Sequence, residues 1–368
     1  MEVLVENLTF LTWQQVLMWL IGGVLIYLAI VKEMEPSLLL PMGFGAILVN
    51  LPNSGAAEVI AHLFELGIAG HELFPLLLFI GIGAMIDFGP LLSNPKMLLF
   101  GAAAQFGIFF TMVAAVLLGF ALAAAASIGI IGAADGPPSI LVSQVLHSSY
   151  VGPIAVAAYS YMALVPIIQP FAIKLVTTKK ERRIRMPYNP KNVSRTLRIC
   201  FPILVTIIAG FIAPMSVSLV GFLMFGNLLR ECGCLDRLSE TAQNTLANLI
   251  TLLLGITISF SMRADQFVNR NTLIIMGLGL VAFVFDSIAG VMFAKLLNLF
   301  SKKKVNPMVG AAGISAFPMS ARVNQKMGQE ADCTNHLLMH AVGANVAGQI
   351  ASVLAGGMIL NLVPQLMG

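Results

Sequence analysis

The stretch from residue 128 to residue 140, IGIIGAADGPPSI, places an aspartate inside a long apolar segment. Asp135 is followed at once by Gly136, Pro137 and Pro138, which a regular helix cannot easily accommodate. An ionisable side chain at the centre of a bilayer costs roughly 2.5–3.5 kcal/mol on insertion scales, so such residues usually serve a function. Glycine and proline also free backbone carbonyl groups at the same place. The stretch therefore predicts a cation or proton site at a broken helix.

The composition around this stretch is that of a membrane protein. Of the 368 residues, 58% are hydrophobic and 10% are charged, and the mean hydropathy is +0.90. In soluble domains, roughly 45–50% of the residues are hydrophobic and about 25% are charged. Because one transmembrane helix needs about 20 apolar residues, we expect a single all-α polytopic domain, 1–368, with roughly ten to twelve helical segments. These segments lie near 15–31, 37–51, 73–92, 97–122, 124–146, 150–176, 199–214, 216–229, 245–261, 272–297, 305–328 and 334–366.

The positive charge is concentrated in one loop, 177–198, whose single acidic residue is Glu181. Such a loop is predicted to be cytoplasmic, and the run 302–304, three lysines, should lie on the same side. The net charge of +4 therefore reports topology, and we expect no nucleic-acid partner. The acidic start, MEVLVENLTFLTW, has no basic region, so we expect no cleaved signal peptide. The basic residues of the loop are Lys179, Lys180, Arg182, Arg183, Arg185, Lys191, Arg195 and Arg198.

The basic loop divides the chain into two halves, and we expect residues 73–176 of the first and 199–366 of the second to be inverted repeats. Each half has an apolar helix that leads to an interrupted stretch: GAADGPPS at 132–139 in the first and GAAGISAFPMS at 310–320 in the second. Asp135 and Ser315 each stand three residues before a proline. Interrupted segments at matching positions predict two broken helices that meet near the membrane midplane and form a binding site. The alternative is that glycine and proline are simply common in membrane helices.

Several polar side chains could complete a site at the two breaks. Asp135 could bind Na⁺ together with backbone carbonyl oxygens, because a hard cation prefers oxygen ligands. Ser315 and Asn345 offer further oxygens, although Asn345 could instead link helices in its glycine-rich segment, AVGANVAG at 341–348. Arg322 could hold a carboxylate bidentately or extend to the membrane interface.

Other polar residues inside apolar segments have less certain uses. Tyr159 and Tyr161 face different ways on a helix, so we do not expect both to serve one site. His336 and His340 have the spacing to share a helix face, but no third residue completes a transition-metal site. Asp286 lies within FVFDSI at 283–288 and is expected to make a secondary polar contact.

Three motifs together resemble one known family. They are GAADGPPS at 132–139, AVAAYSYMALVP at 155–166 and SAFPMSAR at 315–322. They are similar to the beta subunit of sodium-translocating biotin-dependent decarboxylases, which serve oxaloacetate, methylmalonyl-CoA, glutaconyl-CoA and malonate. The likeness runs from the first span to the C-terminus through the Asn345 segment. One departure is Pro138, where the family commonly has threonine, so a possible hydroxyl ligand is missing.

The resemblance implies a reaction and partners. A carboxyltransferase alpha subunit would transfer CO₂ to biotin on a carrier subunit or domain. The membrane subunit would then decarboxylate this carboxybiotin, consume a proton and export Na⁺. A small membrane gamma or delta subunit and further copies of the chain would complete the complex. It would lie in the cytoplasmic membrane of a bacterium or archaeon.

The resemblance also implies roles for individual residues. Asp135, Asn345 and Ser315 would bind Na⁺, and Ser315 and Tyr161 would serve a second ion or proton step. Arg322 would hold the carboxylate of carboxybiotin, in a polar region that also contains the two cofactor-binding candidates Asn306 and Gly310.

Two other functions fit the apolar helices and the buried aspartate. The chain could be a secondary transporter, such as a Na⁺ symporter or a Na⁺/H⁺ antiporter, or a non-catalytic anchor for a soluble enzyme. The sequence leaves open which acid or thioester supplies the biotin, the Na⁺ stoichiometry, the oligomer number, the exact span count and whether Li⁺ replaces Na⁺.

Overall fold

A computed structural model describes residues 10–33, 36–70, 73–187, 193–301 and 303–367. Over these residues every regular element is helical, which confirms the all-α class. The acidic start of the chain is described only from residue 10 onward, and Lys191 and Lys302 are outside the described residues. The expectations for these parts of the chain therefore stay predictions.

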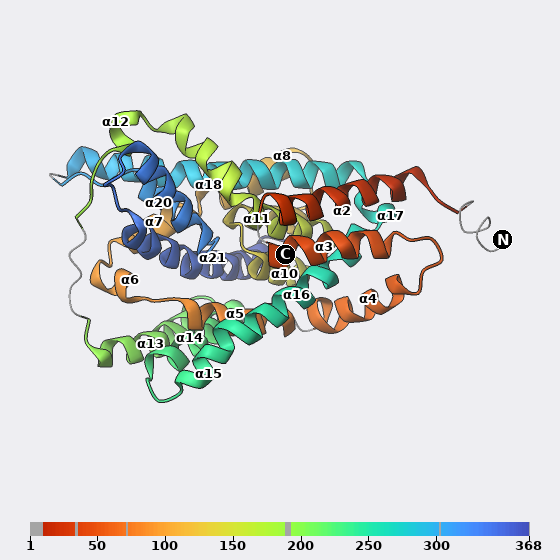
Figure 1. Cartoon of the computed structure of the whole chain (residues 1–368), viewed down its shortest axis with the longest axis horizontal. Helices are drawn as coiled ribbons and strands as arrows, with labels where there is room; N and C mark the ends of the chain where they lie inside the picture. Colours follow the sequence, from red (N-terminus) through yellow and green to blue (C-terminus); the bar gives the residue numbers. More distant parts are fainter. Residues whose placement is uncertain (1–9, 34–35, 71–72, 188–192, 302, 368) are drawn as a thin grey trace.

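The helices keep the labels of Figure 1, with η marking 3-10 or π turns. The first half contains α2 (Trp13–Val31), α3 (Pro36–Val49), α4 (Ala56–Phe64), η1 (Glu65–Ala69), α5 (Leu73–Met85), α6 (Gly89–Ser93), α7 (Met97–Ala103), α8 (Phe106–Leu117), α9 (Leu122–Gly129), η2 (Ile130–Ala133), α10 (Gly136–Val145), α11 (Val151–Val176) and α12 (Lys179–Arg182). The second half contains α13 (Arg195–Ile212), η3 (Pro214–Ser216), α14 (Val217–Glu231), α15 (Asp236–Glu240), η4 (Thr241–Leu246), α16 (Ala247–Ile258), η5 (Ser259–Met262), α17 (Ala264–Phe267), α18 (Arg270–Phe300), α19 (Met308–Ala311), α20 (Met319–Ala331) and α21 (Leu338–Met367).

Within the described residues, six stretches of helix are long and apolar enough to cross a membrane, or up to eight stretches if each of two bent pairs counts as one span. The chain is therefore a multi-pass membrane protein. Several of the expected ten to twelve segments are shorter or interrupted helices, such as Pro36–Val49 and Leu122–Ala133. The six stretches are Trp13–Val31, Met97–Leu117, Arg195–Ile212, Asp236–Met262, Arg270–Phe300 and Leu338–Met367.

The helices divide into enclosed and peripheral ones. In α21, 72% of the most apolar 18-residue window is buried, against 11% in α13 and 17% in α2. The peripheral helices expose large apolar side chains, including Leu20 on α2 and Phe211 on α13. A helix with an apolar outer face satisfies its own backbone hydrogen bonds and needs no water, so these faces suit lipid.

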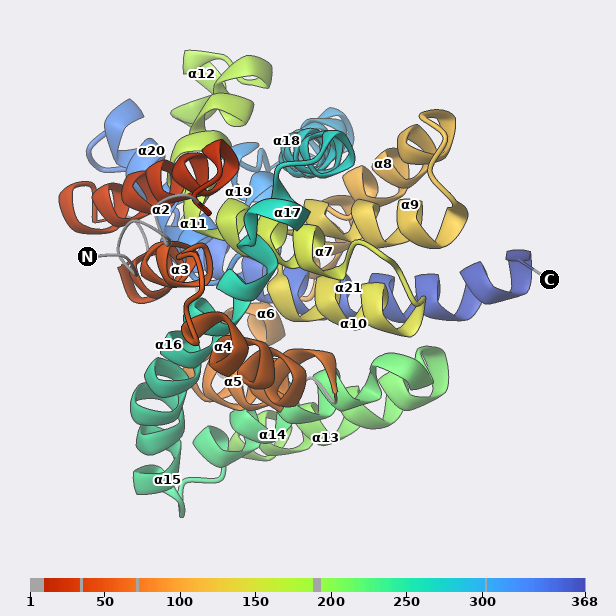
Figure 2. The same ribbon diagram turned by 90° about the vertical axis from the view of Figure 1, so that its right-hand side faces the viewer.

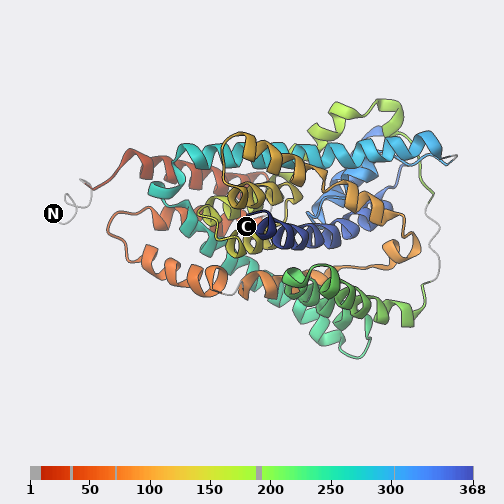
Figure 3. The ribbon, with the colours of Figure 1, turned by 180° about the vertical axis from the view of Figure 1, so that it is seen from behind.

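The enclosed helix α21 lies at the centre of the arrangement. It packs against α7, α10 and α20, which come from both halves of the chain. Figures 2 and 3 place it between α18 on one side and the pair α13 and α14 on the other. The long helix α18 in turn packs against α8, α11, α19 and η2. The two interrupted stretches are therefore close to α21 and α18, while the inverted symmetry of 73–176 and 199–366 stays a prediction.

Candidate functional site

The first break lies between η2 and α10. Ala134 takes up a left-handed conformation, with φ of 51°, and Asp135 is extended, with φ of −130° and ψ of 110°. The two prolines that follow occupy the first turn of α10, where their missing N–H groups cost nothing. A Cβ atom on Gly136 would lie 2.1 Å from the ring of Tyr159, so only glycine fits there. Asp135 is thereby held at a helix start, 4% exposed, in the position that its flanking glycine and prolines predict.

The second break, between α19 and α20, touches the first one through Ser315. Its hydroxyl group donates to the carbonyl oxygen of Ala133 at 2.8 Å, and its backbone N–H donates to the same oxygen at 3.2 Å. Gly313 packs so closely on α7 that an added Cβ would lie 2.4 Å from the carbonyl oxygen of Phe100. The two interrupted stretches therefore meet, as the sequence predicts.

Helix α21 supplies a polar stripe that covers both breaks. The side-chain nitrogen of Asn345 donates to the carbonyl oxygen of Ile314 at 2.6 Å. The side-chain nitrogen of Gln349 donates to the carbonyl oxygen of Ser315. The hydroxyl oxygen of Ser352 is 3.1 Å from Oδ2 of Asp135. Sequence reasoning missed Gln349 and Ser352. Their spacing of four and seven residues from Asn345 places them on one helix face, and this periodicity was the available signal.

The cluster has more oxygen acceptors than donors. Nitrogen atoms of Asn345 and Gln349 donate to the backbone carbonyl oxygens of Ile314 and Ser315, so Asn345 links α21 to the second break and not to a neighbouring helix. The oxygen atoms Oδ1 of Asn345 and Oε1 of Gln349 are buried and have no hydrogen-bond partner among the described residues. They lie in one network with the carboxyl group of Asp135 and the hydroxyl groups of Ser315 and Ser352. Amide, hydroxyl and carboxylate oxygens are what a hard cation requires, so these residues fit Na⁺.

The two tyrosines of α11 face different neighbours, as their spacing predicts. Tyr159 packs against Gly136, immediately after Asp135. The Tyr161 hydroxyl group donates to the carbonyl oxygen of Met276 on α18, and its ring lies against Gly279. Tyr161 is therefore on the side of α11 that contacts α18, while Tyr159 is the tyrosine that packs beside the aspartate.

The remaining predicted site residues lie outside this cluster. Arg322 is exposed on α20, two residues after Ser320, whose hydroxyl group accepts from Gln169 at 2.6 Å. Asn306 is fully buried and donates to the carbonyl oxygens of Arg182 and Ile184, at 2.9 Å and 2.8 Å. It holds the basic loop against the start of α19.

Gly310 serves a close helix approach. An added Cβ would lie 2.0 Å from the carbonyl oxygen of Gly290, so glycine lets α19 lie against α18. This contact keeps the segment before the second break in place. Asn306 and Gly310 thus share one region of the fold, near α19.

The expectation that His336 and His340 could share a helix face was wrong. His340 is on α21, but His336 precedes the start of that helix at Leu338, so the two do not share a helix face. Their ring nitrogens have separate partners: Gln325 lies 3.3 Å from His336, and the carbonyl oxygen of Met186 lies 3.2 Å from His340.

A second buried carboxyl group, that of Asp286, lies behind the first break. Its Oδ1 accepts from the backbone N–H of Gly107 in the first turn of α8. An added Cβ on Gly132 would lie 2.6 Å from its Oδ2. The expected secondary polar contact of Asp286 is therefore present, and it joins α18, α8 and η2.

Carboxyl groups outside the membrane segments pair with the basic loop. Asp332 is 2.6 Å from Arg185 and accepts from the hydroxyl group of Thr334 at 2.8 Å. Hydrogen bonds from Thr334 and then from Arg185 lower the pKa of Asp332 to about 2. Asp332 therefore stays ionised at physiological pH, and its contact with Arg185 anchors the loop.

Comparison with known proteins agrees with this architecture. Residues 14–363 match the family described as the Na⁺-transporting oxaloacetate decarboxylase beta subunit. The chain is 49% identical to the glutaconyl-CoA decarboxylase subunit beta of Acidaminococcus fermentans, over 96% of this chain and 94% of that protein. It is 50% identical to the methylmalonyl-CoA decarboxylase subunit beta of Propionigenium modestum, over 94% of each chain. It is also 44% identical to the probable oxaloacetate decarboxylase beta chain of Vibrio cholerae, over 97% of each.

These matches extend over nearly the whole chain and therefore include both breaks, the basic loop and the α21 stripe. The relatives are named as beta subunits of decarboxylases, which act as parts of complexes, and not as free transporters. The chain belongs to the family of Na⁺-transporting oxaloacetate decarboxylase beta subunits.

Proposed function

We propose that this subunit decarboxylates carboxybiotin presented by a partner subunit and couples that step to Na⁺ export, consuming one proton per carboxyl group. The observation that carries the proposal is the buried Asp135 cluster, in which oxygens of Asn345 and Gln349 have no partner in the described part of the chain. A buried carboxylate and unpaired acceptors are costly unless a cation or a proton satisfies them.

In this proposal Na⁺ is the cargo, and the chain supplies its oxygen ligands. Asp135 contributes the negative charge, and Asn345, Gln349 and Ser352 contribute neutral oxygens from α21. Ser315 acts as the link, because its two hydrogen bonds to the Ala133 carbonyl oxygen connect the breaks. A change in the second break would therefore move a carbonyl group next to Asp135.

The decarboxylation itself breaks the N–C bond of carboxybiotin, releases CO₂ and leaves a nitrogen that takes up a proton. Arg322, exposed on α20, would hold the departing carboxylate, with Asn306 and Gly310 supporting the same region. Tyr161 and Ser315 would serve the proton or second-ion step. Loss of the anion removes its preference for one conformation, so the populations shift and Na⁺ leaves on the other side.

The partners follow from the reaction. A biotin carrier subunit or domain must reach the side on which Arg322 is exposed, and a carboxyltransferase alpha subunit must load the carrier. A small gamma or delta subunit and further copies of this chain would share the cytoplasmic membrane of a bacterium or archaeon. Which acid or thioester is used is a property of the carboxyltransferase.

The test uses the complex purified with its co-purifying subunits and reconstituted into vesicles. We expect Na⁺ uptake that requires the carboxylated substrate and stops when avidin blocks biotin. Asp135→Asn should abolish both Na⁺ uptake and Na⁺-stimulated decarboxylation, while avidin still recognises the carrier. Near-normal Na⁺-stimulated decarboxylation by Asp135→Asn would contradict the proposal, and avidin-insensitive transport by the isolated chain would instead identify a secondary transporter.

A further inference from the structure

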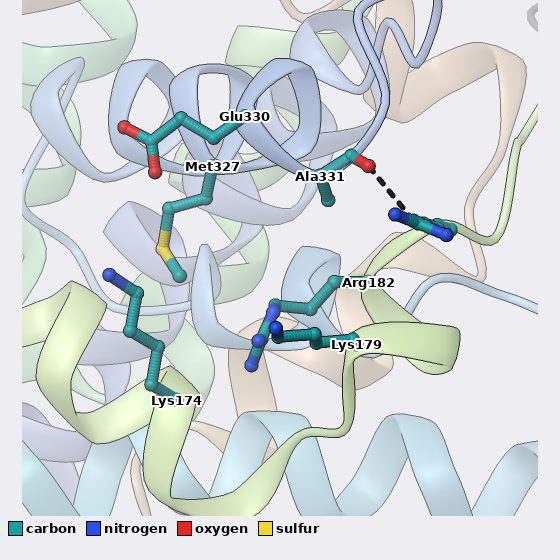
Figure 4. A pocket seen from close by; sticks show the side chains of 7 residues that line it. Lys174, Lys179, Arg182, Met327, Glu330 and Ala331 are labelled. Carbon is teal, nitrogen blue, oxygen red and sulfur yellow. Dashed lines mark hydrogen bonds between the residues drawn. The ribbon is translucent and has the colours of Figure 1, made fainter.

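A basic cavity lies at one edge of the helix bundle, and none of the residues that line it is used above for Na⁺ or carboxybiotin. It has a volume of about 220 Å³ and is formed by the last turns of α11, by α12 and by the last turns of α20 (Figure 4). The residues that line it are Lys174, Lys179, Arg182, Arg183, Met327, Glu330 and Ala331.

The charges around this cavity are unbalanced, because four cationic side chains face one carboxylate, Glu330. Two of the cations are held in place by backbone carbonyl groups. Arg182 Nη1 donates to the carbonyl oxygen of Thr177 at 2.9 Å, and Arg183 Nε donates to that of Ala331 at 3.0 Å. The remaining guanidinium N–H groups are pre-organised for an anion, which lowers the cost of binding one.

The size of the cavity limits the ligand. Sites for drug-sized molecules are typically about 300–1,000 Å³, so a cavity of about 220 Å³ suits a single charged group better than a whole metabolite. Figure 4 shows Lys174, Lys179 and Arg182 extending into the space beneath α20. Arginine forks and lysine ammonium groups arranged around one space are a common solution for binding phosphate.

The surroundings point to lipid as the source of the phosphate. Lys174 is flanked on α11 by Phe171 and Leu175, which are 62% and 61% exposed. Figures 1 and 2 both place α12 at the rim of the bundle, and an ion pair of 2.9 Å between Glu181 and Lys295 ties it to α18. Acyl chains can therefore lie along the apolar face of α11 while a head group occupies the cavity.

We propose that this cavity binds the phosphate of an anionic phospholipid in the leaflet on the side of the basic loop. Basic pockets at the ends of transmembrane helices recognise acidic head groups in this way. The site would fix the position of α12 and of the end of α20, and it does not depend on the proposed function.

The test measures lipid retention by the full chain in its complex, with native mass spectrometry in detergent containing phosphatidylglycerol or phosphatidylcholine. We expect preferential retention of phosphatidylglycerol. Lys174→Gln with Lys179→Gln should weaken it about thirtyfold, since each cation near anionic lipid contributes roughly a five- to sixfold factor. This pair leaves the backbone contacts of Arg182 and Arg183 intact. Glu330→Gln should strengthen retention about fivefold, an outcome that misfolding cannot produce.

The matched control is Lys180→Gln with Lys303→Gln, which removes the same charge from two exposed residues that do not line the cavity. It should leave retention within about twofold of the original, since the basic residues that line the cavity are unchanged. Equal retention of both lipids, or equal losses in the two double variants, would overturn the proposal. If inorganic phosphate alone displaces phosphatidylglycerol at low millimolar concentration, a free anion and not a lipid is the ligand.

Discussion

Asp135 and Asp286 are both buried between membrane helices, but the polar groups around them differ. Asp135 accepts from the hydroxyl group of Ser352 and lies in a network with two amide oxygens that have no partner among the described residues. Asp286 instead accepts at Oδ1 from the backbone of Gly107 at the start of α8, where the helix dipole favours negative charge, while its Oδ2 has no partner among the described residues. Burial of a carboxyl group alone therefore does not identify an ion site. We expect an ion site where further unpartnered oxygens lie in the same network as the carboxyl group, because a cation can be bound by several of them at once.

The sharpest test of this comparison is the pair of variants Asp135→Asn and Asp286→Asn. We expect Asp135→Asn to reduce Na⁺-dependent turnover roughly 100-fold or more, because interactions with a charged group are each worth roughly 1.5–3 kcal/mol. Its thermal stability should be unchanged or higher, since a buried charge has been removed. Protection against thermal unfolding by added NaCl, relative to KCl, should disappear with the carboxylate.

Asp286→Asn should show the reverse pattern. Asparagine keeps an oxygen that can accept from Gly107, so we expect a stability loss of about 1 kcal/mol and a Na⁺ half-saturation within about twofold of the original. A large rise in the Na⁺ concentration needed for half-maximal turnover, with normal stability, would place Asp286 in the ion path and remove the distinction between the two carboxyl groups.

A second prediction concerns the neutral oxygens on α21. Gln349→Met keeps the volume but removes both the unpartnered Oε1 and the donor to Ser315. We expect the Na⁺ half-saturation concentration to rise roughly tenfold, from the loss of about 1–1.5 kcal/mol of interaction. Maximal turnover at saturating Na⁺ should fall much less.

The matched control for Gln349→Met is Asn227→Leu. Asn227 is also buried, and its Oδ1 has no partner among the residues that the structure describes, but its nitrogen donates to the carbonyl oxygen of Ile86 at 2.8 Å, on the segment after α5. The Asn227→Leu variant should be less stable but keep the original Na⁺ dependence, because no buried carboxyl group is among the hydrogen-bond partners of Asn227 in the described chain. Equal shifts in the two variants would mean that unpaired amide oxygens report packing alone.

A third prediction tests the contact between Asp286 and the first break. Gly132→Ala would place a methyl group 2.6 Å from Oδ2 of Asp286 and 2.8 Å from Cβ of Ala282. Overpacking of this kind costs about 1–3 kcal/mol, measurable as a lower midpoint of thermal unfolding. Combining it with Asp286→Ala should cost less than the sum of the two single changes, because one of the clashing groups is gone. Strict additivity would show that η2 does not rest on this carboxyl group.

The sequence predicted the parts of the site whose signal is local. Asp135 was found because glycine and prolines follow a charged residue in an apolar segment, and Ser315 because it stands three residues before Pro318. Gln349 was missed although helical spacing from Asn345 could have revealed it. The partner of Asp286 could not be found in this way, since Gly107 is 179 residues away and becomes its neighbour only when α8 packs on α18.

The smallest effect on stability is expected for a third carboxyl group, that of Asp332, which lies outside the membrane segments. Asp332 faces donors from Thr334 and Arg185, and these lower its pKa to about 2. A lowered pKa stabilises the folded protein above the ordinary value of 3.8, and this contribution is lost as the pH falls through about 2. Asp332→Asn should therefore reduce thermal stability by the same small amount at pH 8 and pH 5. Between pH 5 and pH 3 the difference between the original and the variant should shrink, because the unfolded carboxyl group takes up its proton near pH 3.8 and the folded one only near pH 2. A difference that is the same at pH 5 and pH 3 would show that Asp332 titrates normally and that its donors do not hold the charge. Because Asp332 shares no hydrogen-bond partner with Asp135 among the described residues, the Na⁺ half-saturation should not move at pH 8 or pH 5, which separates loop anchoring from ion binding.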